Sequence, residues 1–152
     1  LLPDILDSFS NNKLLKIRNP SSVRPWQHVL EPLSGYLVLA EKMYFKPKRY
    51  SESWNFGPKD CNFKSVIWIL KEIEKFWKKG NWIIEKNINI SETELLKLDI
   101  SKSTSLLNWS PKWNINKTLD LTVNWHKSWL SSENMFDVCL LEIKKYFGEN
   151  HE

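Results

Sequence analysis

The chain has few glycines, few cysteines and no long apolar run. Its 152 residues include 4 glycines, at positions 35, 57, 80 and 148, and none belongs to a G-x-G-x-x-G phosphate-binding loop. The 2 cysteines, Cys61 and Cys139, are isolated, which indicates neither a zinc site nor a disulfide framework. No segment approaches the roughly 18 apolar residues that a membrane span needs. The first residues lack a basic and an apolar segment, so we expect no signal peptide and a cytoplasmic location.

Composition and charge indicate one folded domain over residues 1–152. Hydrophobic residues make up 41% of the chain and aromatic residues 13%, including 9 tryptophans, which is typical of a protein with a core. The net charge of +4, from 22 basic and 18 acidic residues, is too small and too evenly spread to indicate nucleic-acid binding. This charge suits a small anionic ligand. We therefore expect neither a nucleic acid nor a membrane as partner.

The segment 18–35 is the most distinctive part of the sequence. Prolines at positions 20, 25 and 32 fix the backbone and disfavour helix at the residue before each, including Glu31. Guanidinium groups suit bidentate contacts with phosphate, and an aromatic ring can cover a base or sugar. The segment therefore presents five candidate binding residues: Arg18, Arg24, Trp26, Gln27 and His28. From the residues alone, solvated arginines and a tryptophan in the core are the simpler interpretation.

The same segment resembles a known family. Residues 17–20 (Ile-Arg-Asn-Pro) and 24–37 (Arg-Pro-Trp-Gln-His-Val-Leu-Glu-Pro-Leu-Ser-Gly-Tyr-Leu) resemble the signature of CDP-glucose 4,6-dehydratases, which are extended short-chain dehydrogenases/reductases. Weaker similarities follow in family order, for example at residues 54–58 and 107–111. The resemblance covers nearly the whole chain but only the second half of the family.

The resemblance implies a fold and its limits. We expect an α/β chain that forms the C-terminal substrate-binding lobe, with residues 30–58 returning to a Rossmann-type sheet as a helix and a strand. The NAD-binding N-terminal half is expected to be missing, so the chain itself would hold no cofactor, although the complete family enzyme uses NAD. One Tyr-x-x-x-Lys pattern, from Tyr44 to Lys48, is rejected because Pro47 interrupts the helix between the two side chains. No catalytic residue is therefore expected here.

The resemblance also assigns binding roles, with CDP or a CDP-hexose as ligand. It implies that Arg24 grips the diphosphate with help from Arg18, while the three residues 26–28 shape the pocket. The remaining candidates are Leu2 and Pro3 near the base and Glu92, which keeps its family position although Ser91 replaces the preceding histidine. In the complete enzyme, NAD oxidises the sugar at C4, water leaves across C5 and C6, and hydride returns to C6. Without the other half, we expect the chain to be inactive alone.

Two alternatives stay open. The chain could be a truncated, non-catalytic protein that binds a nucleotide sugar or associates with a partner, either the missing N-terminal half or a second copy. It could also come from a related epimerase or dehydratase that acts on UDP- or dTDP-sugars.

Local patterns predict the individual elements. Hydrophobic spacing and turn residues predict helices over residues 3–10, 32–46, 62–79, 114–130 and 134–147, and strands over residues 13–17, 53–56 and 82–85. Asn62 and either Asn114 or Asn116 are the expected helix caps, and Gly80 and Gly148 the expected helix ends. Lys46, Lys48 and Arg49 should form a solvated basic loop.

Overall fold

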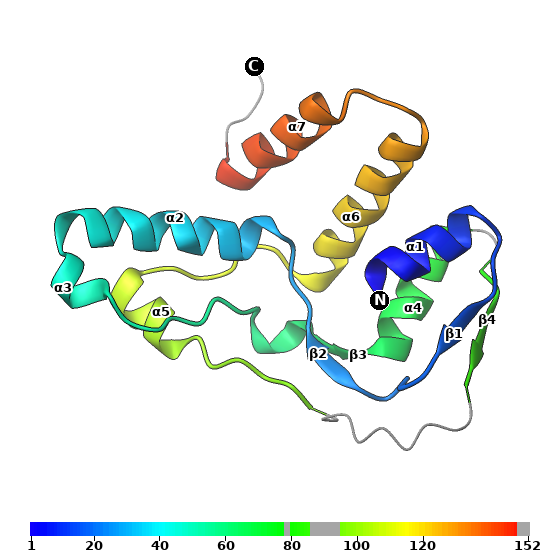
Figure 1. Cartoon of the computed structure of the whole chain (residues 1–152), viewed down its shortest axis with the longest axis horizontal. Helices are drawn as coiled ribbons and strands as arrows, with labels where there is room; N and C mark the ends of the chain where they lie inside the picture. The colour runs from blue at the N-terminus through cyan, green and yellow to red at the C-terminus, as the bar shows by residue number, and fades with distance from the viewer. Residues whose placement is uncertain (78–79, 86–94, 149–152) are drawn as a thin grey trace.

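The computed structural model describes residues 1–77, 80–85 and 95–148 (Figure 1). In chain order its elements are α1 (Leu2–Ser10), β1 (Leu15–Ile17), β2 (Val23–Pro25), α2 (Leu30–Phe45), α3 (Pro47–Tyr50), a 3-10 turn (Asp60–Asn62), β3 (Phe63–Ser65), α4 (Val66–Glu74), β4 (Trp82–Ile84), α5 (Ser101–Leu107), α6 (Ile115–Leu130) and α7 (Met135–Phe147). β1 pairs with β4 in parallel, and β2 pairs with β3 in antiparallel register, with Arg24 opposite Lys64. None of the helices described has the length and apolar character needed to cross a bilayer.

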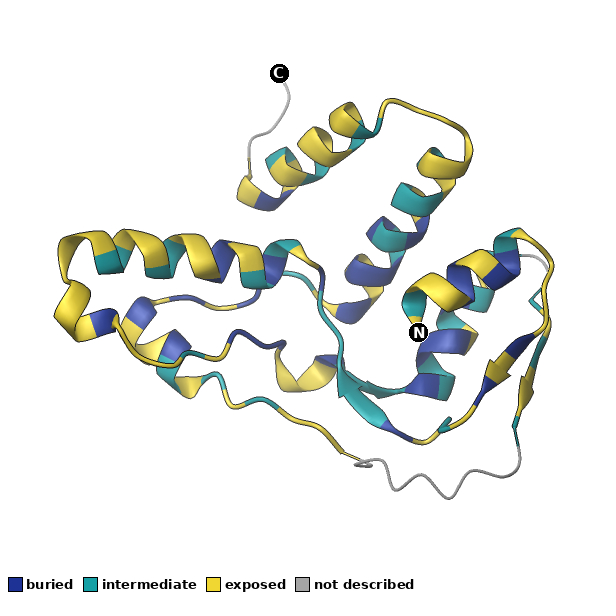
Figure 2. Ribbon diagram, in the orientation of Figure 1, coloured by how far each residue is buried: buried dark blue, intermediate teal, exposed yellow. Residues whose placement is uncertain are grey.

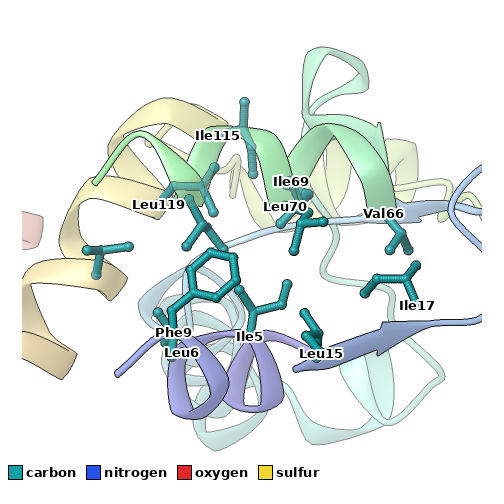
Figure 3. Close-up of a cluster of buried hydrophobic side chains, with 12 residues drawn as sticks. Ile5, Leu6, Phe9, Leu15, Ile17, Val66, Ile69, Leu70, Ile115 and Leu119 are labelled. Carbon is teal, nitrogen blue, oxygen red and sulfur yellow. The ribbon is translucent and has the colours of Figure 1, made fainter. Parts of the chain in front are cut away.

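The larger core joins α1, β1, α4 and α6 (Figure 3). Ile5 and Phe9 lie one turn apart on α1, so both point at the apolar face of α4. Ile69 and Leu70 of α4 are fully buried there. Burial of each such side chain stabilises the fold by about 1.5–3 kcal/mol. This core holds β1, and therefore the residues that follow β1, in a fixed position.

A smaller core lies between α2, α3 and α5. Its buried members are Tyr50, Phe56, Leu107 and Trp109, against which partly buried residues of α2 pack. Gly35 is required at this contact because a Cβ built on it would lie 2.2 Å from the ring of Phe56. A larger residue would push the ring away from α2.

Several expected elements are confirmed. The helix at residues 3–10, the strand at 13–17 and the strand at 82–85 correspond to α1, β1 and β4. Asn114 caps α6 by accepting a hydrogen bond from Lys117 N, at 2.9 Å. Gly148 ends α7 with a φ of 83°, the left-handed conformation that favours glycine.

The predicted helix start at Pro32 was wrong by two residues. α2 begins at Leu30 and includes Glu31, because proline in a first turn removes an N–H that needs no helical partner. Lys46, Lys48 and Arg49 are exposed as expected, but Lys48 and Arg49 belong to the short helix α3 rather than to a loop, and Pro47 occupies its first turn. Residues 53–56, all of which are described, do not form the expected strand.

Asn62 is not a helix cap. Its buried side chain accepts a hydrogen bond from Ile115 N at 2.9 Å and donates one to Trp113 O at 3.3 Å. The cap of α4 is Ser65, whose hydroxyl accepts from Trp68 N. Because Phe63 belongs to β3, α4 starts later than predicted, and it ends at Glu74 rather than near Gly80.

Candidate functional site

A cavity of about 550 Å³ lies where β1 ends and β2 begins. We call it the Arg24 cavity; its lining residues are Leu1, Asp4, Leu15, Lys16, Ile17, Arg18, Asn19, Ser22, Arg24, Trp26 and Val66. Three of these side chains are cationic and one is anionic. The lining therefore favours an anionic ligand.

Lys16 and Arg18 reach the cavity because β1 delivers them. Arg18 directly follows β1, and Glu85 directly follows the parallel neighbour β4. Glu85 N donates to Ile17 O at 2.9 Å, which continues the strand pairing by one residue. The Glu85 carboxylate then lies 3.7 Å from Arg18 Nε and 3.9 Å from Lys16 Nζ. One carboxylate thus partly balances two cations at the cavity.

Arg24 and Trp26 are positioned by the β2–β3 pair. Arg24 Nη1 donates to Val23 O at 3.0 Å, which directs the guanidinium back along β2. Trp26 Nε1 donates to Lys64 O at 2.8 Å, and the indole also packs against the larger core. The ring is therefore fixed at one end by a hydrogen bond and along its side by apolar contacts. It forms a rigid wall of the cavity.

Gln27 and His28 do not line this cavity. Gln27 Nε2 donates to Phe56 O at 2.9 Å, which ties the segment to the smaller core. His28 is 5% exposed, and its ring makes an edge contact with Trp113. Leu30 N donates to His28 Nδ1 at 3.3 Å, so Nε2 carries the proton and faces Glu142 Oε2 at 3.6 Å. Burial lowers the pKa of His28, although Glu31 opposes the shift.

The remaining predicted site residues are Leu2, Pro3 and Glu92. Leu2 packs against the larger core, whereas its neighbours Leu1 and Asp4 line the Arg24 cavity. Pro3 occupies the first turn of α1 and is exposed. Glu92, together with Ser91, lies outside the residues that the structure describes.

A buried polar network at the start of α2 was not predicted. The carboxylate of Glu31, 0% exposed, accepts hydrogen bonds from Lys112 N, Trp113 N and the Tyr146 hydroxyl at 2.6–3.0 Å. Ser34 Oγ accepts from Trp109 Nε1 at 2.9 Å and donates to Glu31 O at 2.7 Å. The sequence contained one signal for this network, because the carboxyl of Glu31 and the hydroxyl of Ser34 lie three residues apart in a mostly apolar helix.

The distinctive segment 18–35 therefore has two parts with different tasks. Its first part places Arg18, Arg24 and Trp26 around one cavity. Its second part, from His28 to Gly35, fastens α2 to α7 and to the smaller core through buried polar and close apolar contacts. Only the first part has the geometry of a ligand site.

A curated relative covers almost the whole chain. No family model matches the sequence. CDP-glucose 4,6-dehydratase from Salmonella typhimurium is 45% identical over 149 residues, which are 97% of this chain and 42% of that protein. The chain is therefore similar to a CDP-glucose 4,6-dehydratase over almost all of its own residues. It matches the C-terminal part of its Salmonella relative and spans less than half of that relative's length.

Solved structures confirm the fold expected for this family. UDP-glucuronic acid 4-epimerase from Bacillus cereus, in complex with NAD, matches with a TM-score of 0.67 at 21% identity, over 82% of this chain and 37% of that chain. dTDP-glucose 4,6-dehydratase from Bacillus anthracis, also in complex with NAD, matches with a TM-score of 0.66 at 20% identity, over 84% and 39%. The chain thus has the α/β architecture of the corresponding part of an extended short-chain dehydrogenase/reductase.

Gly35, Gly57 and Gly80 do not form a cradle for NAD. A Cβ added to Gly35 would meet Phe56, one added to Gly57 would meet Leu98, and one added to Gly80 would meet Phe9. These glycines accommodate neighbouring side chains and leave no open backbone for a pyrophosphate. We therefore assign no reaction step through NAD to the residues described.

Proposed function

We propose that this chain is the nucleotide-sugar-binding part of a CDP-glucose 4,6-dehydratase and that CDP, or a CDP-hexose, occupies the Arg24 cavity. The observation that carries the proposal is the convergence of Arg18, Arg24 and Trp26, from separate positions of one segment, on a single cavity of about 550 Å³. Sites for small ligands are typically about 300–1,000 Å³.

The chemistry of the lining supports a diphosphate. The guanidinium of Arg24 offers paired N–H donors to phosphate oxygens, and Arg18 adds a second cation from the end of β1. Each charge-assisted hydrogen bond contributes about 1.5–3 kcal/mol. The fixed indole of Trp26 supplies a flat apolar surface for the cytosine or a sugar.

In this proposal the chain binds and orients the substrate, and it does not carry out the dehydration. The described residues hold CDP through its phosphates. The hydride acceptor and the catalytic base belong to the part of the complete enzyme that lies outside its match with this chain. The expected product of the complete enzyme is a 4-keto-6-deoxy sugar.

A titration of CDP into the chain, followed by tryptophan fluorescence, tests the proposal. We expect saturable quenching because Trp26 lines the cavity. UDP and dTDP serve as competitors, since the solved neighbours are named for UDP- and dTDP-sugars. Weaker displacement by both nucleotides supports the CDP assignment. Absence of saturation by CDP, in protein that still melts cooperatively, would refute it.

A further inference from the structure

The lining of the Arg24 cavity includes one acidic residue, Asp4, which has no part in the phosphate contacts proposed above. Asp4 lies in the first turn of α1, directly before Ile5. Ile5 is 0% exposed in the larger core, whereas the Asp4 side chain is 72% exposed. Figure 2 shows such buried and exposed residues following one another along α1. The core thus fixes the backbone of Asp4 and leaves its carboxylate accessible to a ligand.

Asp4 and the arginines reach the cavity from different elements. Asp4 comes from α1, and Figure 3 shows Ile5 of α1 beside Leu15, the first residue of β1. Arg18 directly follows the other end of β1. Strand residues rise about 3.3 Å each, so the two ends of this segment lie up to about 10 Å apart. The cavity therefore has an acidic side chain near the start of β1 and arginines beyond its end.

The two ends differ in hydrogen-bonding capacity. Among the described residues that line the cavity, the three cationic side chains and Trp26 can only donate, whereas Asn19 and Ser22 can donate and accept. The carboxylate of Asp4 can only accept. Its Oδ2 lies 3.1 Å from Leu1 N, and a carboxylate has two oxygens with which to accept. A ligand group that donates is therefore directed to Asp4, while phosphate oxygens, which accept, are directed to the cations.

The pyrimidine bases differ in such a donor. Cytosine carries an amino group at position 4, and carboxylates accept hydrogen bonds from it. Thymine carries the acceptor O4 at this position, and uracil has the same oxygen. A carboxylate that faces O4 meets a second acceptor, so the two groups repel each other. An aspartate at this end of the cavity therefore favours cytosine over uracil and thymine.

We infer that Asp4 is the residue that selects cytosine, by accepting a hydrogen bond from the amino group at position 4 of the base. The inference rests on the proposed function, because the diphosphate of the same ligand is held by Arg18 and Arg24. Sequence reasoning selected the neighbours Leu2 and Pro3, neither of which lines the cavity. The nucleotide preference is thereby assigned to one side chain outside the distinctive segment 18–35.

The ratio of CDP affinity to UDP affinity, measured by calorimetric titration, tests this inference. We expect the wild type to bind CDP at least about fivefold more tightly than UDP. In Asp4→Asn the amide can accept from cytosine or donate to O4 of uracil, so the ratio should fall to about one. The ratio is the readout because removal of a negative charge strengthens the binding of both anions alike.

Asp7→Asn is the matched control. It removes the same charge from the same helix, but Asp7 does not line the cavity, and its carboxylate lies 3.0 Å from Lys13 Nζ. The ratio for this variant should equal that of the wild type. A cooperative melt shows that each variant is folded.

A modified ligand tests the same contact without any variant. The 5′-diphosphate of 2-pyrimidinone riboside has hydrogen at position 4, so it offers neither the amino donor nor the O4 acceptor. The wild type should bind it more weakly than CDP and more tightly than UDP. Binding as tight as that of CDP would overturn the inference.

The outcomes separate this inference from the proposed function. A preference for CDP that Asp4→Asn retains would overturn the role of Asp4 and leave CDP binding in the cavity standing. Equal binding of CDP and UDP by the wild type would overturn the role of Asp4 as well, although not the binding of a nucleoside diphosphate. Absence of saturable CDP binding would overturn the proposed function itself, and the inference with it.

Discussion

The hydroxyl of Tyr146 donates a 2.6 Å hydrogen bond to the carboxylate of Glu31, across 115 residues of sequence. Both side chains are buried, at 2% and 0% exposure. Burial and the neighbouring Glu31 raise the pKa of Tyr146 well above its ordinary value, so the phenol remains a donor at any physiological pH. The bond fixes the end of α7 to the start of α2, just after the segment that forms the Arg24 cavity.

Glu31→Gln should destabilise the protein substantially. The amide cannot replace the carboxylate, which accepts from Lys112 N, Trp113 N and Tyr146 together. We expect a loss of about 2–4 kcal/mol in the free energy of unfolding, measured by urea denaturation. Glu41→Gln, on the exposed side of α2, is the control and should stay within about 0.5 kcal/mol. A Glu31→Gln variant as stable as this control would contradict the account.

Stability should fall on mild acidification because of His28. The pKa of His28 in the folded state lies below the ordinary 6.5. Above pH 6.5 the neutral ring therefore makes its full contribution to the free energy of unfolding, and this contribution is lost as the pH falls through the folded-state pKa. Burial raises the pKa of Glu142 above 4.5, with Lys117 and Lys145 opposing, so its contribution is complete below 4.5 and is lost as the pH rises. The two groups therefore have opposite pH dependences.

His28→Gln should remove the histidine part of this dependence. Urea midpoints measured between about pH 7.5 and about pH 5 should fall less in the variant than in the wild type. His126→Gln is the comparison variant: burial also lowers the pKa of His126, so this variant measures the part of the wild-type pH dependence that belongs to the second histidine. Parallel pH profiles for the wild type and His28→Gln would refute the prediction.

Glu85→Gln should strengthen CDP binding. The Glu85 carboxylate lies near Lys16 and Arg18 and opposes the positive charge of the cavity. Since these side chains are largely exposed, we expect a modest gain of about 2–5-fold in affinity. Calorimetric titration at low and high salt measures the gain, which should shrink as salt rises. Weaker binding by the variant would show that Glu85 instead helps to hold the ligand.

Strong local patterns predicted much of the fold. α1, α6 and α7 follow from apolar spacing and from caps such as Asn114 and Gly148, whose effects are local. The predicted helix start at Asn62 and the predicted strand at residues 53–56 were wrong, because contacts with distant parts of the chain determine the conformation of both segments. Asn62 bonds to residues more than 50 positions away, and Phe56 packs on Gly35.

The site was predictable only in part. Proline stiffness and arginine chemistry indicated the segment that carries Arg18, Arg24 and Trp26, and the structure brings these three to one cavity. Sequence reasoning placed His28 beside them because it is adjacent in the chain. The buried partners Glu142 and Tyr146 lie on α7, more than 110 positions away, and no local pattern identifies them.

The most direct test compares CDP affinity in Arg24→Ala and His28→Gln. The account predicts that Arg24→Ala loses at least about tenfold in affinity, since a charge-assisted phosphate contact is removed from the cavity. His28→Gln should keep the wild-type affinity in protein that is folded, because His28 faces Glu142 and not the cavity. Unchanged affinity in Arg24→Ala would contradict the central claim, as would loss of binding in folded His28→Gln.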